Sequence, residues 1–260
     1  MHDFPAGRLA LWATAWLGGR ASYDETLDAI TGDAAHRVTG LPGTAVAVPL
    51  REALSALRGL GERRLRLVLP APGDVRGLPP VPGLAPLALE TGQVAVGERV
   101  ALVPEPVGPE ALQWTAFVLD GAPAAPPPVE GTLRAASGAL DLAMADAART
   151  LAELDLARWH PEVPALLAGL GRPVRGVTLP DGTDALALSL LARGMRLAAV
   201  LDLALADAPG GAVTHRQAAA RDEALRPLSA AVREALVAAY NDVPRRPPDD
   251  TAARYRPGHR

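Results

Sequence analysis

The chain has 260 residues, of which 49% are hydrophobic and 21% are charged, and its formal net charge is -3. This is the balance of a folded protein with one large or two small domains, and it excludes a disordered chain. All 26 basic residues are arginine, and cysteine is absent. The use of arginine in place of lysine, together with much alanine, glycine and proline, is typical of a high-GC genome.

The missing residue types exclude several kinds of chemistry. Without lysine there is no Walker-type phosphate loop and no Schiff-base chemistry, and without cysteine there is no thiol nucleophile, disulfide or thiolate metal site. No serine lies in a G-x-S-x-G turn, and the histidines occur singly, without metal-binding spacing. We therefore assign no catalytic residue, metal or cofactor, and lean against an enzyme, although a site built from distant residues stays open.

Membrane and targeting signals are weak. The apolar run from residue 9 to residue 17 is too short to span a bilayer and lacks a basic segment before it. The longer apolar run at 185–206 contains Arg193, Arg196 and Asp202, which are costly in lipid. We expect a cytoplasmic protein without a membrane partner.

The N-terminal part begins with three predicted helices and continues with a sheet. The helices are expected at 5–17, 22–31 and 49–59, from apolar spacing, a capping box at Ser22 and terminal glycines. Short apolar runs separated by glycine turns then predict an antiparallel meander over about 64–119. The expected strands are 64–69, 87–89, 93–96, 100–103 and 113–119.

The second part of the chain is predicted to be helical. Residues 121–131 form a Pro/Ala-rich linker, and helices are expected within 132–242. They cover 132–158, about 162–169, 184–206, and a last helix that follows a capping box at Thr214 and kinks at Pro227. The tail at 243–260 is expected to be disordered. The fold class is therefore α+β, with a C-terminal helical hairpin or bundle.

Asp202 is an unusual residue because it falls on the apolar face of its predicted helix. A carboxylate there needs a partner, since burial of an unpaired charge is unfavourable. If the next helix folds back antiparallel, Arg221 approaches the level of Asp202. We expect a contact between the two side chains, either as a structural strut or as part of a binding site.

Four further residues are candidates for binding. Asp74 and Arg76 lie in the loop after the first predicted strand, where ligands often bind, although Pro-Gly-Asp is also an ordinary turn. Trp159 and His160 precede Pro161. Trp159 is either a core anchor or helix stop or a platform for ring stacking, and His160 is either a surface or capping histidine or a general base.

Trp12 and Trp16 share one face of the first helix, which either packs inside its own domain or binds a partner. On this basis the leading functional hypothesis is a non-catalytic interaction or regulatory protein, which binds a protein partner or itself. The alternative is a small-molecule-binding protein or enzyme with Asp, Arg and His groups between sheet and helices. Nucleic-acid binding through the arginines of the tail is a minor hypothesis, because acidic residues dilute them.

Overall fold

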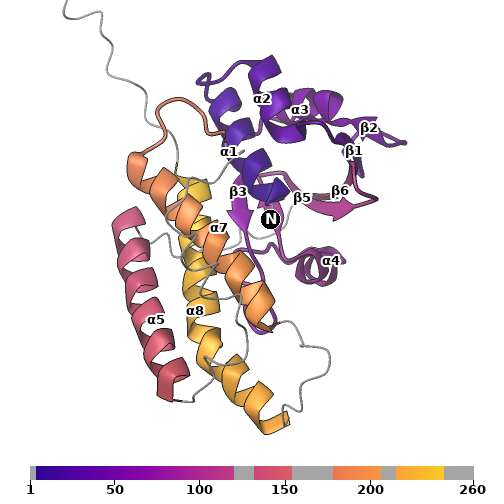
Figure 1. Ribbon diagram of the computed structural model, residues 1–260. Coiled ribbons are helices and arrows are strands. Elements are labelled where there is room, and N and C mark those ends of the chain that lie inside the picture. The colour runs from indigo at the N-terminus through magenta and orange to yellow at the C-terminus, as the bar shows by residue number, and fades with distance from the viewer. Residues whose placement is uncertain (1–3, 120–131, 154–177, 206–214, 243–260) are drawn as a thin grey trace, which may run out of the picture.

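A mixed six-stranded sheet and three long helices beside it organise the protein (Figure 1). The computed structural model describes residues 4–119, 132–153, 178–205 and 215–242, and every structural statement below concerns these residues. The predicted α+β class, with a helical C-terminal part, is confirmed.

The N-terminal helices agree closely with the sequence patterns. They are α1 (Pro5–Leu17), α2 (Tyr23–Thr31) and α3 (Leu50–Gly59). The capping box of α2 is present, because the Ser22 hydroxyl accepts the backbone N–H of Glu25 while the Glu25 carboxylate accepts that of Ser22.

The sheet has the strand order β2-β1-β6-β5-β4-β3. Strands β3 to β6 form the predicted antiparallel meander. Strand β1 was not predicted, and its parallel pairing with β6 makes the sheet mixed. The strands are β1 (Ala35–Thr39), β2 (Val48–Pro49), β3 (Arg66–Val68), β4 (Val94–Val96), β5 (Val100–Pro106) and β6 (Ala111–Val118).

The strand predicted at 87–89 is wrong, because these residues belong to helix α4 (Leu84–Thr91). Gly83 and Gly92 flank this helix with φ values of 80° and 71°, a conformation that favours glycine. The glycine turn expected between residues 89 and 93 is therefore the end of the helix at Thr91 and Gly92. Three apolar residues are too few to distinguish a helical period from a strand period.

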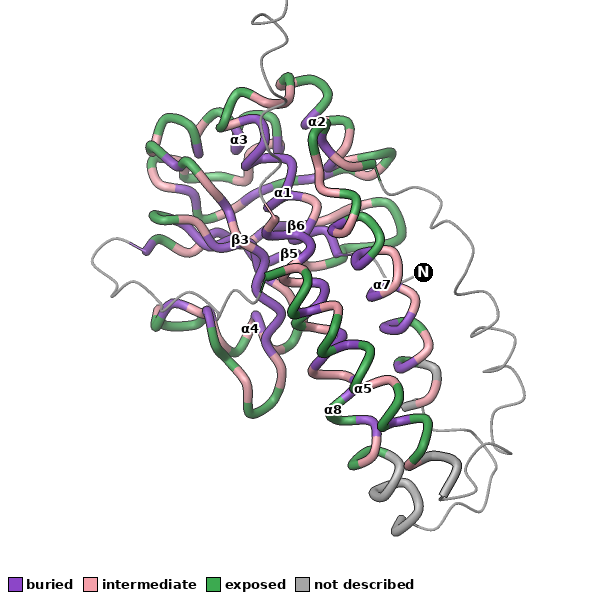
Figure 2. The backbone as a smooth tube through the Cα atoms, turned by 90° about the vertical axis from the view of Figure 1, so that its left-hand side faces the viewer, coloured by how far each residue is buried: buried purple, intermediate pink, exposed green. Residues whose placement is uncertain are grey.

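The two faces of the sheet pack against different helices. Alternate strand residues such as Ala95 and Leu102 join a large core with α1, α3 and the C-terminal helices. Their neighbours Val94 and Val103 join a smaller core with α4 on the opposite face. This alternation follows from the strand period of two, and Figure 2 shows the buried backbone concentrated in α1 and the strands.

The C-terminal part consists of α5 (Leu133–Glu153), α7 (Ala185–Leu205) and α8 (His215–Asn241). Helix α8 packs against both α5 and α7 and also contacts α1 and β3. Pro227 lies within α8. The C-terminal end of α8 thereby joins the bundle to the sheet.

Several predictions fall outside the described residues. These are the linker at 121–131, the short helix at about 162–169, the cap at Thr214 and the tail at 243–260. Among the helices that the structure describes, none is both long enough and apolar enough to cross a membrane.

Candidate functional site

The loop that leaves β3 makes a tight turn at Ala71-Pro72-Gly73-Asp74. The N–H of Asp74 donates to the Ala71 carbonyl at 2.8 Å, and the N–H of Ala71 donates to the Asp74 carbonyl at 2.9 Å. Gly73 has a φ of 82°, which a turn with proline at its second position requires of its third residue. The local sequence thus fixes the direction in which the Asp74 side chain leaves the loop.

Asp74 holds Arg76 through a two-pronged pair. Nε of Arg76 donates to Oδ1 of Asp74 at 2.8 Å, and Nη2 donates to Oδ2 at 2.9 Å. The backbone N–H of Arg76 also donates to Oδ1, at 3.3 Å. Parallel charge-assisted hydrogen bonds of this kind fix the plane of a guanidinium group as well as its position.

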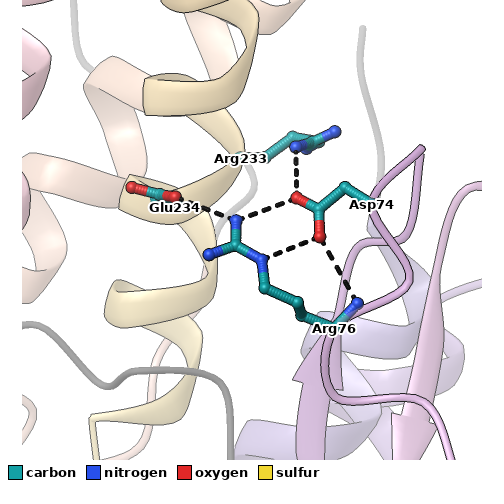
Figure 3. Close-up of polar contacts among 4 residues, drawn as sticks. All are labelled: Asp74, Arg76, Arg233 and Glu234. Carbon is teal, nitrogen blue, oxygen red and sulfur yellow. Dashed lines mark hydrogen bonds and ion pairs between the residues drawn. The ribbon is translucent and has the colours of Figure 1, made fainter. Parts of the chain in front are cut away.

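Helix α8 contributes two more charges, as Figure 3 shows. Nη2 of Arg233 donates to Oδ2 of Asp74 at 2.9 Å, and Oε1 of Glu234 accepts from Nη2 of Arg76 at 3.2 Å. The four side chains therefore form one chain of ion pairs, Glu234–Arg76–Asp74–Arg233, between the loop and α8.

The arginines set the ionisation of this cluster. Hydrogen bonds from Arg76 lower the pKa of Asp74 from 3.8 to about 2, against a smaller opposing effect of burial. The pKa of Arg76 is raised above its ordinary value, mainly by its hydrogen bond to Asp74. Asp74 is therefore a fixed negative charge and Arg76 a fixed positive charge at neutral pH.

The cluster lies at the edge of a cleft of about 760 Å³ between the loop, α5 and α8. One part of its lining is charged, and the other is formed by small apolar side chains of α5 and α8 together with Val68 of β3 and Leu69, which follows it. The polar lining residues are Arg64, Asp74, Arg76, Thr132, Arg233, Glu234, Asn241 and Asp242. The cleft thus combines an apolar wall with polar side chains from the β3 loop and α8.

Asn241 fixes the floor of the cleft. Its buried side-chain amide accepts the N–H of Leu67 at 2.7 Å and donates to the carbonyl of Leu67 at 3.0 Å, as a neighbouring strand would. Nη2 of Arg64 donates to the Asn241 carbonyl at 2.8 Å. The end of α8 is thereby held against the edge of β3.

Two family models match the sequence. That of the N-terminal domain of Rv1486c-like proteins matches residues 6–130, and that of the C-terminal domain matches residues 134–237. The uncharacterized protein Rv1486c of Mycobacterium tuberculosis (strain ATCC 25618 / H37Rv) is 33% identical, over 92% of this chain and 96% of that protein. The chain belongs to the Rv1486c-like family.

A second relative in this family is the uncharacterized protein ML1804 of Mycobacterium leprae. It is 28% identical, over 92% of this chain and 97% of its own length. No solved structure matches the chain.

Of the binding residues expected in this Rv1486c-like chain, the structure brings Asp74 and Arg76 together in the cleft. Trp159 and His160 lie outside the described residues. The expected burial of Asp202 is wrong, because Asp202 is exposed on α7. The side chain of Arg221 is not described, so its pairing with Asp202 stays a prediction.

The two tryptophans of α1 do not form an exposed face. Trp12 is 2% and Trp16 5% exposed. The indole N–H of Trp12 donates to the Thr178 carbonyl at 3.1 Å, and the guanidinium of Arg58 lies 3.7 Å from the ring centroid of Trp16. The interface predicted for these residues is therefore wrong, and packing within the molecule, the other interpretation, is observed.

The contribution of α8 to the cleft was not predicted from the sequence. Arg233 adjoins the buried stripe that contains Val232 and Leu236, and an arginine in that position was a usable signal. Its partner Asp74 could not be named, because the two residues are 159 positions apart. The described residues contain no group of three or more acidic, His or Cys side chains placed to hold a metal ion.

Proposed function

We propose that this chain is a small-molecule-binding protein of the cytoplasm, whose ligand occupies the cleft between the β3 loop, α5 and α8. The observation that carries the proposal is the convergence of Asp74 and Arg76 with Arg233 and Glu234 in the lining of a cleft of about 760 Å³ that also has an apolar wall. Volumes between about 300 and 1,000 Å³ are usual for ligand sites.

The ionisation of the cluster favours binding over proton transfer. A general base is most effective when its pKa lies near the working pH, whereas the pKa of Asp74 is about 2. Arg76 stays charged as well. Two fixed charges of opposite sign, held in one plane, are suited to orienting a polar group of a ligand.

The sequence favoured an interaction or regulatory protein over a small-molecule binder. Its named surface was the pair Trp12 and Trp16, and both side chains are buried. The alternative required at least two candidate groups to converge between sheet and helices, and Asp74 and Arg76 do so. These observations therefore favour the small-molecule-binding protein.

The uncharged dye N-phenylnaphthylamine, which becomes fluorescent in apolar sites, tests the proposal without reference to charge. We expect the protein to bind the dye in a saturable manner and Ala139→Trp, which fills the cleft, to abolish binding. Ala145→Trp is the matched control, since Ala145 is exposed on the same helix but does not line the cleft. Absence of saturable binding, or equal loss in both variants, would contradict the proposal.

A further inference from the structure

We infer that the ligand of the cleft is an amphipathic monocarboxylate, whose carboxylate binds Arg76 in place of Glu234. The inference rests on the proposed function and names the class of ligand. It follows from the unused edge of one guanidinium group, from the weak hold on Glu234 and from the charges of the lining.

The guanidinium group of Arg76 has two edges that can each hold a carboxylate. Asp74 occupies the edge formed by Nε and Nη2, with hydrogen bonds of 2.8 and 2.9 Å. On the other edge, Nη2 makes one contact of 3.2 Å to Glu234, and Nη1 makes no hydrogen bond within the described part of the chain. Figure 3 shows this third nitrogen pointing away from Asp74. A ligand carboxylate could take both N–H groups of this edge.

Glu234 is the weakest member of the cluster. Its side chain is 57% exposed and holds Arg76 through one oxygen, whereas the Asp74 side chain is 25% exposed and accepts from two arginines. Exposed single ion pairs contribute little stability, because water solvates both charges. Glu234 can therefore turn into solvent at small cost when a ligand arrives.

The charge of the lining limits the ligand to one negative charge. Three arginines and three acidic residues line the cleft, so their formal charges cancel. When Glu234 turns into water, one positive charge is left in excess, and one carboxylate restores neutrality. A phosphate monoester close to two negative charges would leave the cleft negative.

The remaining wall suits an apolar body. Near the cluster, α5 presents Ala135, Ala136 and Ala139, and α8 presents Val237 and Ala238. These short side chains form an apolar surface without hydrogen-bonding groups. An alkyl or aryl group attached to the carboxylate would remove this surface from water.

Calorimetric titration with octanoate, octanol and octyl phosphate tests the class of ligand on the full chain. We expect octanoate to bind about tenfold more tightly than octanol and more tightly than octyl phosphate. Arg76→Ala should reduce the affinity for octanoate to that for octanol. Arg76→Lys, which keeps the charge but not the paired N–H donors, should give an intermediate loss of affinity. Octanol and N-phenylnaphthylamine should bind these variants as they bind the original protein.

Glu234→Gln should change the affinity for octanoate in the opposite direction to the Arg76 variants. Removal of the competing carboxylate should tighten octanoate binding about threefold or more while octanol is unaffected. Glu223→Gln, an exposed glutamate of the same helix that pairs with Arg226 away from the cleft, should change neither. Because both glutamates are exposed, these variants are expected to fold even if an Arg76 variant does not.

The outcomes separate the two proposals. Two results would overturn the monocarboxylate inference while N-phenylnaphthylamine still binds in the cleft and the proposed function stands. One is that octanoate binds no better than octanol; the other is that Glu234→Gln fails to tighten octanoate binding. Tighter binding of octyl phosphate also overturns the inference. If the dye does not bind in the cleft, the proposed function itself fails.

Discussion

Asp74 accepts four hydrogen bonds from two arginines, and this single residue connects the β3 loop to α8. Both its oxygens are engaged by groups that stay charged under all ordinary conditions. The result is a carboxylate whose pKa is far below its value in an unfolded chain.

The pKa of Asp74 predicts an acid dependence of stability. Its value falls from 3.8 to about 2 on folding, so the stabilisation is fully present above about pH 4 and is lost as the pH falls through about 2. Asp74→Asn should be less stable than the original protein at neutral pH, and the difference should shrink over this acid range. Urea unfolding of both proteins at a series of pH values measures it; a difference that is constant with pH would contradict the assignment.

Glu62 is a second carboxylate with a defined place, and it was not singled out in the sequence. It is 3% exposed and accepts the backbone N–H groups of Glu98, Arg99 and Val100, at 2.8, 2.7 and 3.0 Å. It thus closes the turn between β4 and β5. A Cβ atom at Gly97 would lie 2.5 Å from this carboxylate, which accounts for glycine there.

Replacement of Glu62 by glutamine should destabilise the fold. One side-chain oxygen becomes an N–H₂ group facing backbone donors, and we expect a loss of about 2–4 kcal/mol in the free energy of unfolding. Glu98→Gln is the control, because the Glu98 side chain is exposed in the same turn. Equal urea midpoints for the two variants would show that the contacts to Glu62 add no stability.

At the scale of elements, helices with a regular apolar spacing were predictable, and α2 also has a capping box. Helices α1, α2 and α3 lie within one residue of their expected limits. Strand β1 escaped prediction because Ala35–Thr39 combines only one large apolar residue with polar neighbours, and its pairing with β6 is set by residues far along the chain. Helix α4 escaped because it is short and its flanking glycines resemble hairpin turns.

The candidate site was predictable only in its local half. Asp74 and Arg76 are two positions apart, and the turn before them has a recognisable sequence. Arg233 and Glu234 belong to a helix whose position over the β3 loop depends on the whole tertiary structure. Apolar spacing predicts that α8 exists, but not which end of the sheet it covers.

Helix α8 packs closely on its neighbours at two glycines. A Cβ atom at Gly7 of α1 would lie 2.8 Å from the ring of Tyr240, and one at Gly194 of α7 would lie 2.9 Å from Leu236. Both α8 side chains are buried, so neither can turn away freely. The absence of two side chains therefore sets how near the helices come to one another.

Replacement of glycine by alanine should have opposite effects at close-packed and at open helix positions. Gly7→Ala and Gly194→Ala should each destabilise the protein by about 1–2 kcal/mol, because overpacking exceeds the gain in helix propensity. Gly138→Ala in α5 has open space around its Cβ and should stabilise by about 0.5–1 kcal/mol. Thermal and urea unfolding of the three variants give the comparison; stabilisation at Gly7 would contradict the close packing.

At the scale of the whole molecule, one apolar core extends from α1 and the sheet into α5, α7 and α8. The ring of Phe4 lies 6.3 Å from that of Tyr240. The hydrogen bonds from Trp12 to Thr178 and from Arg64 to Asn241 also join the N-terminal part of the chain to the C-terminal part. The segments matched by the two family models, 6–130 and 134–237, therefore share their interior.

A shared core predicts that both segments unfold together. Tryptophan fluorescence, to which buried Trp12, Trp16 and Trp114 contribute, and helical circular dichroism should give the same urea midpoint. Leu236→Ala in α8 should shift both midpoints equally, by about 2–5 kcal/mol in stability. Two separate transitions would show that the segments are independent in folding.

The pairing of Asn241 with Leu67 also has a consequence beyond stability. Strand β3 ends the sheet, and an uncovered sheet edge is a template on which another chain can add a strand. One side-chain amide at the end of α8 occupies the backbone groups of Leu67 and so blocks that edge. A variant such as Asn241→Ala would leave the edge open to edge-to-edge association, and the protein would aggregate in proportion to its concentration before it lost its native fold.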